Sequence, residues 1–160
     1  MRLTVYADYS LRVLIYVAVQ QERLATIAEI SEAYGISRNH LMKAVHQLGR
    51  LGYLRNVRGR RGGIELARPP AQINLGAVVR DVEDDLALVP CFDPDDASCP
   101  IQGSCRLQGV LGEALRAFFA VLDRYTLADL TRDRQGVLGS LLGMEPAPLL
   151  PLEQIRRQPG

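Results

Sequence analysis

Apolar residues recur at helical spacing over most of the chain, and this pattern predicts a mainly helical fold. The first clear example covers residues 4–20. Its apolar face follows the spacing i, i+4, i+7 and i+8, with Tyr9, Val13, Tyr16 and Val17 at these positions. Asp8 and Arg12 lie four residues apart, so they share one side of this helix.

Two short helices joined by a tight turn are predicted next. Thr26 and Glu29 match a capping box at the start of a helix over 26–35. Gly35 is a natural end for that helix. Ser37 is a good N-cap for a third helix. The apolar positions of the third helix are Leu41, Val45, Leu48 and Leu51. This pair of helices predicts a helix-turn-helix.

A β-hairpin is predicted after the third helix. In "YLRNVRGRRGGIELARP", two strand-like runs flank a tip at 59–63 that is rich in glycine and arginine. Glycine suits such a reversal because it adopts positive φ at little steric cost. A hairpin beside a helix-turn-helix is a wing, and Pro69 and Pro70 end it.

Two more helices are predicted in the second half, over 75–88 with Asn74 as N-cap and over 106–130. The long helix has an apolar stripe formed by Leu107, Leu111, Leu115, Phe118, Leu122 and Tyr125, widened by Val110, Ala114, Ala117 and Val121. A helix this apolar outside a small DNA-binding unit needs a partner helix, which a second subunit would supply.

The expected fold class is therefore mostly α, a winged helix-turn-helix with a β-hairpin wing plus a long C-terminal dimerisation helix. We expect a DNA-binding domain at 1–70, a linking helix and cysteine loop at 71–106, the dimerisation helix at 107–130 and a tail at 131–160. The proline-rich end of the chain predicts that this tail is flexible.

Net charge is only +1 over 160 residues, but the charges are unevenly distributed. Between Arg38 and Arg68 there are eight Lys and Arg side chains and one acid, whereas 81–96 holds seven acids and no basic residue. A basic stretch that coincides with a helix-turn-helix and a wing indicates DNA binding rather than an ordinary solvated surface.

The candidate DNA-binding residues fall on the third helix and the wing. Residues at the start of the second helix of a helix-turn-helix meet base edges in the major groove, whereas other Lys and Arg side chains contact phosphates. The wing arginines are placed to follow the backbone or enter a narrow minor groove. The candidates are Ser37, Arg38, Asn39, His40, Lys43, Arg58, Arg60 and Arg61, with Arg50 and Arg55 as further phosphate contacts.

All three cysteines, Cys91, Cys99 and Cys105, lie in the segment "CFDPDDASCPIQGSC". No apolar run approaches the roughly 20 residues that span a bilayer, and the first helix carries charges that a signal peptide lacks. We therefore expect a cytoplasmic protein without a membrane partner, where clustered thiols indicate metal or redox chemistry. The spacing C-x7-C-x5-C is a weak zinc pattern and leaves three interpretations open: an iron–sulfur cluster, a thiol switch, or three thiols without a role.

An enzyme is not expected. A nucleophilic cysteine needs a nearby base, and the only two histidines, His40 and His46, belong to the predicted DNA-reading helix.

Several segments together resemble the Rrf-type winged-helix regulators, and within them the nitric-oxide-sensing repressors. They are "DYSLRVLIYVA", "TIAEISEAYGISRNHLMKAVHQLGRLGYL", "VRGRRGGIELARPP", "INLGAVVRDVEDDLALVPCF" and "C-x5-C-RLQGVL". The resemblance covers residues 1 to about 130 and is specific because all these parts occur in the same order.

The resemblance implies a homodimer that binds a palindromic operator in double-stranded DNA. It implies an iron–sulfur cluster, with 4Fe–4S favoured over 2Fe–2S, on Cys91, Cys99 and Cys105. Asp8 of the other subunit would be the last ligand, with Arg12 beside it. Nitric oxide would nitrosylate the cluster and release the operator. The alternative is a regulator that senses redox state or iron through cysteine thiols or a different cluster.

Overall fold

The computed structural model describes residues 2–20, 23–93, 95–96, 98–132 and 135–144. Its centre is helix α1 (Val5–Val19), which begins at an N-cap, Thr4, whose side chain accepts a hydrogen bond from the Ala7 N–H. Helices α3 (Arg38–Arg50), α4 (Leu75–Val82) and α6 (Leu127–Thr131) pack around it, together with strand β2 (Gly63–Leu66). Fully buried apolar side chains such as Leu14, Leu41 and Ile73 form one continuous core.

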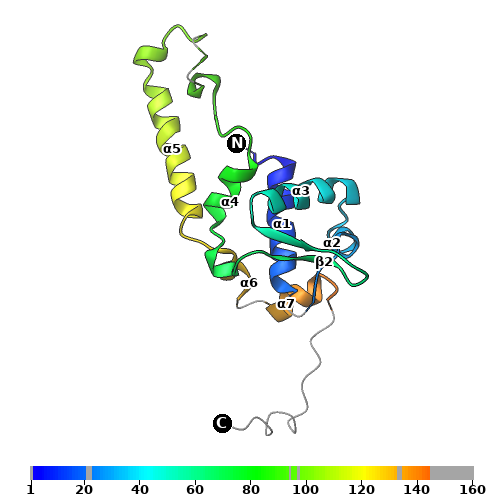
Figure 1. The fold of residues 1–160 in the computed structure, drawn as a ribbon. Coiled ribbons are helices and arrows are strands. Elements are labelled where there is room, and N and C mark those ends of the chain that lie inside the picture. Colours follow the sequence, from blue (N-terminus) through cyan, green and yellow to red (C-terminus); the bar gives the residue numbers. More distant parts are fainter. Residues whose placement is uncertain (1, 21–22, 94, 97, 133–134, 145–160) are drawn as a thin grey trace.

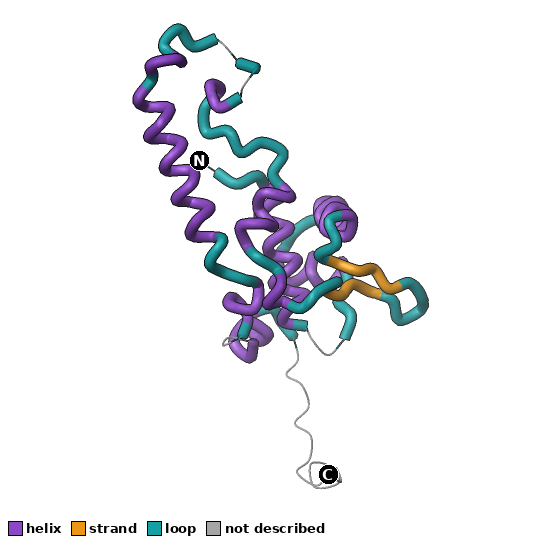
Figure 2. Tube along the Cα trace, turned by 60° about the vertical axis from the view of Figure 1, so that its left-hand side comes forward, coloured by secondary structure: helices purple, strands orange, loops and turns teal. Residues whose placement is uncertain are grey.

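Helices α2 (Ile27–Tyr34) and α3 form the predicted helix-turn-helix. The predicted capping box between Thr26 and Glu29 is present. Gly35 ends α2 with a φ of 65°, in the left-handed region that glycine adopts most easily. Strands β1 (Leu54–Val57) and β2 pair antiparallel as the predicted wing. Figure 2 shows this hairpin projecting on the side of the molecule opposite α5.

Helix α5 (Arg106–Leu122) stands beside α4, away from the rest of the helical body (Figure 1). The segment between α4 and α5 contains two short 3₁₀ turns, η2 (Pro90–Phe92) and η3 (Gln102–Ser104), and carries the three cysteines. A further turn, η1 (Pro70–Gln72), links the wing to α4. The expected fold class, a mostly helical winged helix-turn-helix with a hairpin and a long C-terminal helix, is confirmed.

Two predicted helices are shorter than expected. The helix predicted over 75–88 ends at Val82, because Glu83 is extended and its carboxylate accepts a hydrogen bond from the Thr4 N–H at 2.7 Å. The helix predicted over 106–130 ends at Leu122. Asn74 donates to the carbonyls of Asp123 and Tyr125, which holds the chain in a turn before α6.

The C-terminal segment also differs from the expected flexible tail at 131–160. Thr131 is the buried end of α6, and helix α7 (Gln135–Leu141) follows. Helix α7 contacts α1, and the apolar side chains of Leu142 and Met144, just after it, are partly buried against the core. Residues 133–134 and 145–160, which belong to the same predicted tail, lie outside the described part of the chain.

Candidate DNA interface and cysteine loop

The start of α3 is open to solvent. Ser37 caps the helix by accepting a hydrogen bond from the His40 N–H at 3.4 Å. Ser31 Oγ donates to the Ile36 carbonyl at 2.6 Å and fixes the turn that precedes it. The candidate base readers and phosphate binders of this helix, Ser37, Arg38, Asn39, His40 and Lys43, are all exposed. Because its other side is buried in the core, α3 can present this face to a DNA groove.

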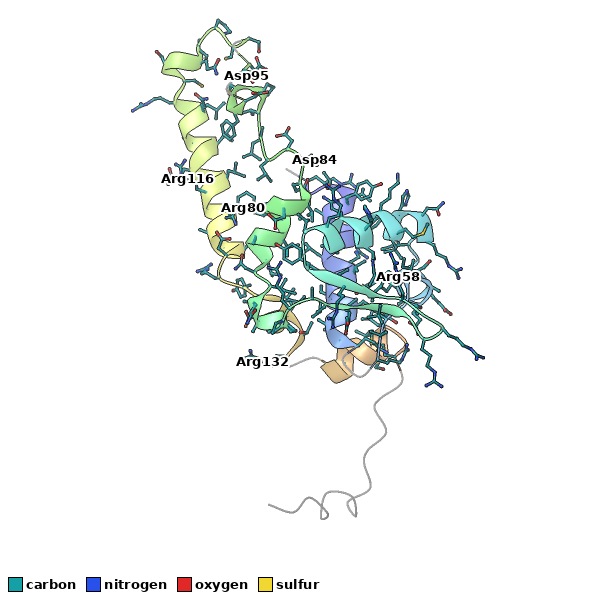
Figure 3. All side chains as sticks on the ribbon, in the orientation of Figure 1. Arg58, Arg80, Asp84, Asp95, Arg116 and Arg132 are labelled. Atoms are coloured by element: carbon teal, nitrogen blue, oxygen red, sulfur yellow. The ribbon has the colours of Figure 1, made fainter. Side chains whose placement is uncertain are left out.

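The wing tip carries the three remaining candidates, Arg58, Arg60 and Arg61, and all three are exposed. Arg58 lies on the far side of the molecule from α5 (Figure 3). Gly63 lets β2 approach the chain before α2, where Ala25 and Ile64 exchange backbone hydrogen bonds of 3.0 and 2.7 Å. The tip therefore extends from a base that is tied to the helical body.

Two arginines of the basic stretch have partners inside the protein. Arg55 pairs with Glu65 across the hairpin at 2.8 Å. Arg68 donates to the carbonyls of Gly52 and Leu51, and its guanidinium lies 4.6 Å from the centre of the Tyr53 ring. Arg68 thus holds the end of α3 against the wing, while Arg55 remains 70% exposed.

The three cysteines are free thiols, each half-buried, on the segment that leads into α5. Cys105 is the N-cap residue of α5. Gln108, one turn into the helix, donates a hydrogen bond of 2.7 Å to the carbonyl of Cys91. Both ends of the cysteine loop are therefore attached to the first turn of α5.

The described residues of the cysteine loop do not form a closed metal site. Among the described residues, no three His, Cys, Asp or Glu side chains meet as a metal ion requires. The donor types nevertheless suit iron–sulfur chemistry, because thiolates are the usual cluster ligands. The half-buried thiols have no hydrogen-bond partner among the described side chains. Asp8, the fourth candidate ligand, is half-exposed on α1 and pairs with Arg12 at 2.9 Å.

Aromatic contacts connect this part of α1 to the helix-turn-helix. Tyr9, next to Asp8, stacks on His40 with ring centroids 5.9 Å apart. Arg12 lies over the Tyr34 ring, 5.7 Å from its centre. Arg12 thus contacts α2 directly, through Tyr34. Asp8 is adjacent in sequence to Tyr9, which contacts the start of α3 through His40.

Two adjacent side chains of helix α4, Arg80 and Asp81, bind different parts of the molecule. Arg80 binds the end of α5, and Asp81 binds Tyr53 next to the wing. Arg80 binds the Asp123 carboxylate through two hydrogen bonds of 2.8 and 2.6 Å and lies 4.4 Å from the centre of the Phe119 ring on α5. On the other side, Asp81 accepts a hydrogen bond of 2.5 Å from the Tyr53 hydroxyl, between α3 and β1. Figure 3 shows Arg80 in the space between α4 and α5. We call Arg80, Asp123, Asp81 and Tyr53 the α4 link.

The electrostatics of the α4 link follow from its hydrogen bonds. The hydrogen bond to Asp123 raises the pKa of Arg80, and the same bond lowers the pKa of the Asp123 carboxyl. Burial raises the pKa of Tyr53 to about 12, and the hydrogen bond to Asp81 and its negative charge add to this effect. Tyr53 is therefore a neutral donor and Asp123 a charged acceptor at neutral pH.

Helix α5 leaves one apolar stripe exposed. The stripe steps by 3, 4, 3 and 4 residues through Leu107, Val110, Ala114, Ala117 and Val121. Leu107 and Val110 are 62% and 61% exposed. The more buried positions of the helix, such as Leu115 and Phe119, face the linker that precedes the cysteine loop. A 3–4 spacing is typical of a seam between paired helices.

Sequence reasoning missed the α4 link, Gln108 and the stacking of Tyr9 on His40. None of them forms a local motif, because the partners lie 28 to 43 residues apart in three cases and 17 residues apart for Gln108 and Cys91. The break between α5 and α6 had a signal, since Thr126 and Asp129 form a capping box that starts a new helix.

No helix in the described part of the chain is both long and apolar enough to cross a membrane.

Comparisons with known proteins match this arrangement. The Rrf2 family, described as "Iron-dependent Transcriptional regulator", matches residues 3–133. The "HTH-type transcriptional regulator NsrR" of Bacillus subtilis is 50% identical over 139 residues, which cover 86% of this chain and 95% of that protein. The protein of the same name from Geobacillus kaustophilus is 50% identical over 143 residues, covering 89% and 97%.

Solved structures show the same fold. The T. potens IscR structure superposes with a TM-score of 0.69 at 24% identity and covers 86% of this chain and 90% of that one. CymR, the global cysteine regulator of B. subtilis, gives a TM-score of 0.68 at 22% identity, covering 82% and 97%. Homologues of this kind are regulators rather than enzymes. The chain therefore belongs to the Rrf2 family of transcriptional regulators, on its NsrR branch.

Proposed function

We propose that this protein is a homodimeric repressor that carries an iron–sulfur cluster, with 4Fe–4S favoured over 2Fe–2S. In this proposal it releases its operator when nitric oxide reacts with the cluster. The observation that carries the proposal is the attachment of the cysteine loop to the first turn of α5, through Cys105 at the N-cap and Gln108 on Cys91. A change in the loop therefore acts directly on α5.

Dimerisation is supported by the exposed apolar stripe of α5. Burying side chains such as Leu107 and Val110 against the same stripe of a second copy would remove them from water. Pairing through α5 also accounts for the incomplete set of ligands in one protomer. Cys91, Cys99 and Cys105 would hold the cluster together with Asp8 of the partner subunit.

When bound, the cluster would supply iron with which nitric oxide can react. The remaining steps belong to the protein itself. Arg12 orients the Asp8 carboxylate through their ion pair. Tyr9, adjacent to Asp8, stacks on His40 at the start of the reading helix. Loss of a ligand bond to Asp8 would thus change the packing at the part of α3 that meets DNA.

The α4 link provides a second mechanical route, from α5 to the wing. Arg80 fixes α4 on α5 through Asp123, and Asp81 fixes the same helix to Tyr53 beside the wing. A shift of α5 therefore moves α4 and the wing base together. In a dimer, the spacing of the two helix-turn-helix units must match the two half-sites of the operator. A small rotation of these units relative to each other is therefore enough to reduce the affinity for the operator.

The proposal is tested by replacing Cys99 with serine and purifying both proteins without oxygen. The wild type should be coloured, contain iron and sulfide, and bind its operator, whereas C99S should be colourless. Ser98→Ala is the matched control, because Ser98 is an exposed neighbour of Cys99. A colourless wild type that cannot be reconstituted, yet binds DNA, would favour the alternative, in which the thiols alone sense redox state or iron.

A further inference from the structure

The outward face of α3 is polar with one exception, Met42. The exposed positions of the helix are Arg38, Asn39, His40, Met42, Lys43, His46 and Arg50. Met42 is 48% exposed, whereas the core-facing Leu41 and Val45 on either side of its turn are 0% and 3% exposed. A single exposed apolar side chain is common at protein surfaces. Met42, however, lies on the face that a helix-turn-helix turns towards the bases, and this position indicates a role in DNA recognition.

Met42 is placed among the candidate base readers. It follows Arg38 by four residues and Asn39 by three, so it neighbours both on the helix surface, and His46 lies one turn further along. It is not among the partly buried apolar side chains that pack against the described core. If α3 lies in the major groove with Arg38 and Asn39 on base edges, then Met42 meets the groove floor as well.

The chemistry of methionine restricts what Met42 can recognise. Its thioether is a weak acceptor and it has no donor or charge, so it reads neither a base hydrogen-bond pattern nor a phosphate. The one apolar group that base pairs present in the major groove is the C5-methyl of thymine. From this position and this chemistry we infer that Met42 is a specificity-determining residue that contacts a thymine methyl in each half-site of the operator. The inference rests on the proposed function as a DNA-binding regulator.

Deoxyuridine tests this contact, because it differs from thymidine only by the missing methyl. Duplexes are first selected from a random library by the full-length protein, and each thymine of the selected site is then replaced by deoxyuridine. Affinities are measured for the wild type, Met42→Ala, Met42→Leu and Val137→Ala. Val137 is the matched control, since it is a 63% exposed apolar residue on α7, outside the proposed interface.

The wild type should lose about fourfold in affinity at one thymine position per half-site, the amount expected for one methyl group leaving an apolar contact. Met42→Ala should bind the unmodified site more weakly and lose nothing further at that position. Met42→Leu and Val137→Ala should keep the sensitivity to deoxyuridine. If deoxyuridine lowers the affinity of the wild type and of Met42→Ala equally, the inference about Met42 is overturned, but the proposed function is not. Failure of the wild type to select any duplex would overturn the proposed function together with the inference.

Discussion

Replacing Gly76 with alanine should have opposite effects on stability with and without the carboxylate of Asp123. Gly76 is buried in the first turn of α4. A Cβ at this position would overlap Oδ1 of Asp123 and come within 3.2 Å of Nη1 of Arg80. Because that carboxylate accepts both hydrogen bonds from Arg80, a methyl group on residue 76 would displace it and break the α4 link.

The expected size of the effect follows from helix propensity. Alanine is more favourable than glycine in a helix by roughly 0.5–1 kcal/mol. In an Asp123→Ala background only the flexible end of Arg80 has to move, so Gly76→Ala should raise the free energy of unfolding by about that amount. This corresponds to about 1–4 °C in melting temperature for a domain of this size. With Asp123 present, loss of the paired hydrogen bonds opposes the gain, and the substitution should lower stability.

Urea denaturation of four proteins measures this difference: the wild type, both single variants and the double variant. Gly136→Ala is the matched control, since Gly136 is also the second residue of a helix and a Cβ there would meet nothing within 4 Å. Its effect should be the same in both backgrounds. If Gly76→Ala changes stability by the same amount and sign with and without Asp123, the described contact between α4 and the end of α5 is refuted.

Three further outcomes are expected. Gly63→Ala should destabilise the protein by roughly 1–3 kcal/mol, because a Cβ there would lie 2.6 Å from the Ala25 carbonyl oxygen; an unchanged urea midpoint would contradict this. Folding raises the pKa of Tyr53 from 10.0 to about 12, so its contribution to stability is complete below pH 10 and is lost as pH rises through 12. Tyr53→Phe should therefore weaken the pH dependence of unfolding in this range, and an equal slope in both proteins would be incompatible with the burial of the Tyr53 hydroxyl and its hydrogen bond to Asp81. Asp8→Ala should keep the far-ultraviolet circular dichroism of the wild type while changing the visible spectrum or its decay under nitric oxide; an unaltered spectrum and decay would remove Asp8 from the candidate ligands.

The parts of the fold that local patterns encode were predictable from the sequence. Capping residues such as Thr26 and Ser37 accept a hydrogen bond from the backbone N–H three positions further along the chain, and both caps are present. The wing followed from glycines around an arginine-rich tip, and its strands pair as expected. These features were accessible because each depends on residues close together along the chain.

The features that sequence reasoning could not supply depend on distant partners. Asn74 was predicted as an N-cap, which it is, but its amide also holds the turn after α5, 49 residues away. That contact ends a helix whose apolar periodicity continues to Tyr125. Likewise, the i,i+4 pair of Asp8 and Arg12 was predictable as one side of a helix, whereas the stacking of Tyr9 on His40 required the packing of α1 against α3.

In the proposed mechanism, one event at the cysteine loop controls DNA binding by both subunits. The most direct test is an anaerobic titration of the purified protein with nitric oxide, in which visible absorbance and binding of fluorescent operator DNA are followed in the same cuvette. We expect the cluster absorbance to change and the operator to be released over the same range of added nitric oxide. Loss of the cluster signal while the operator stays fully bound would contradict the proposed mechanism.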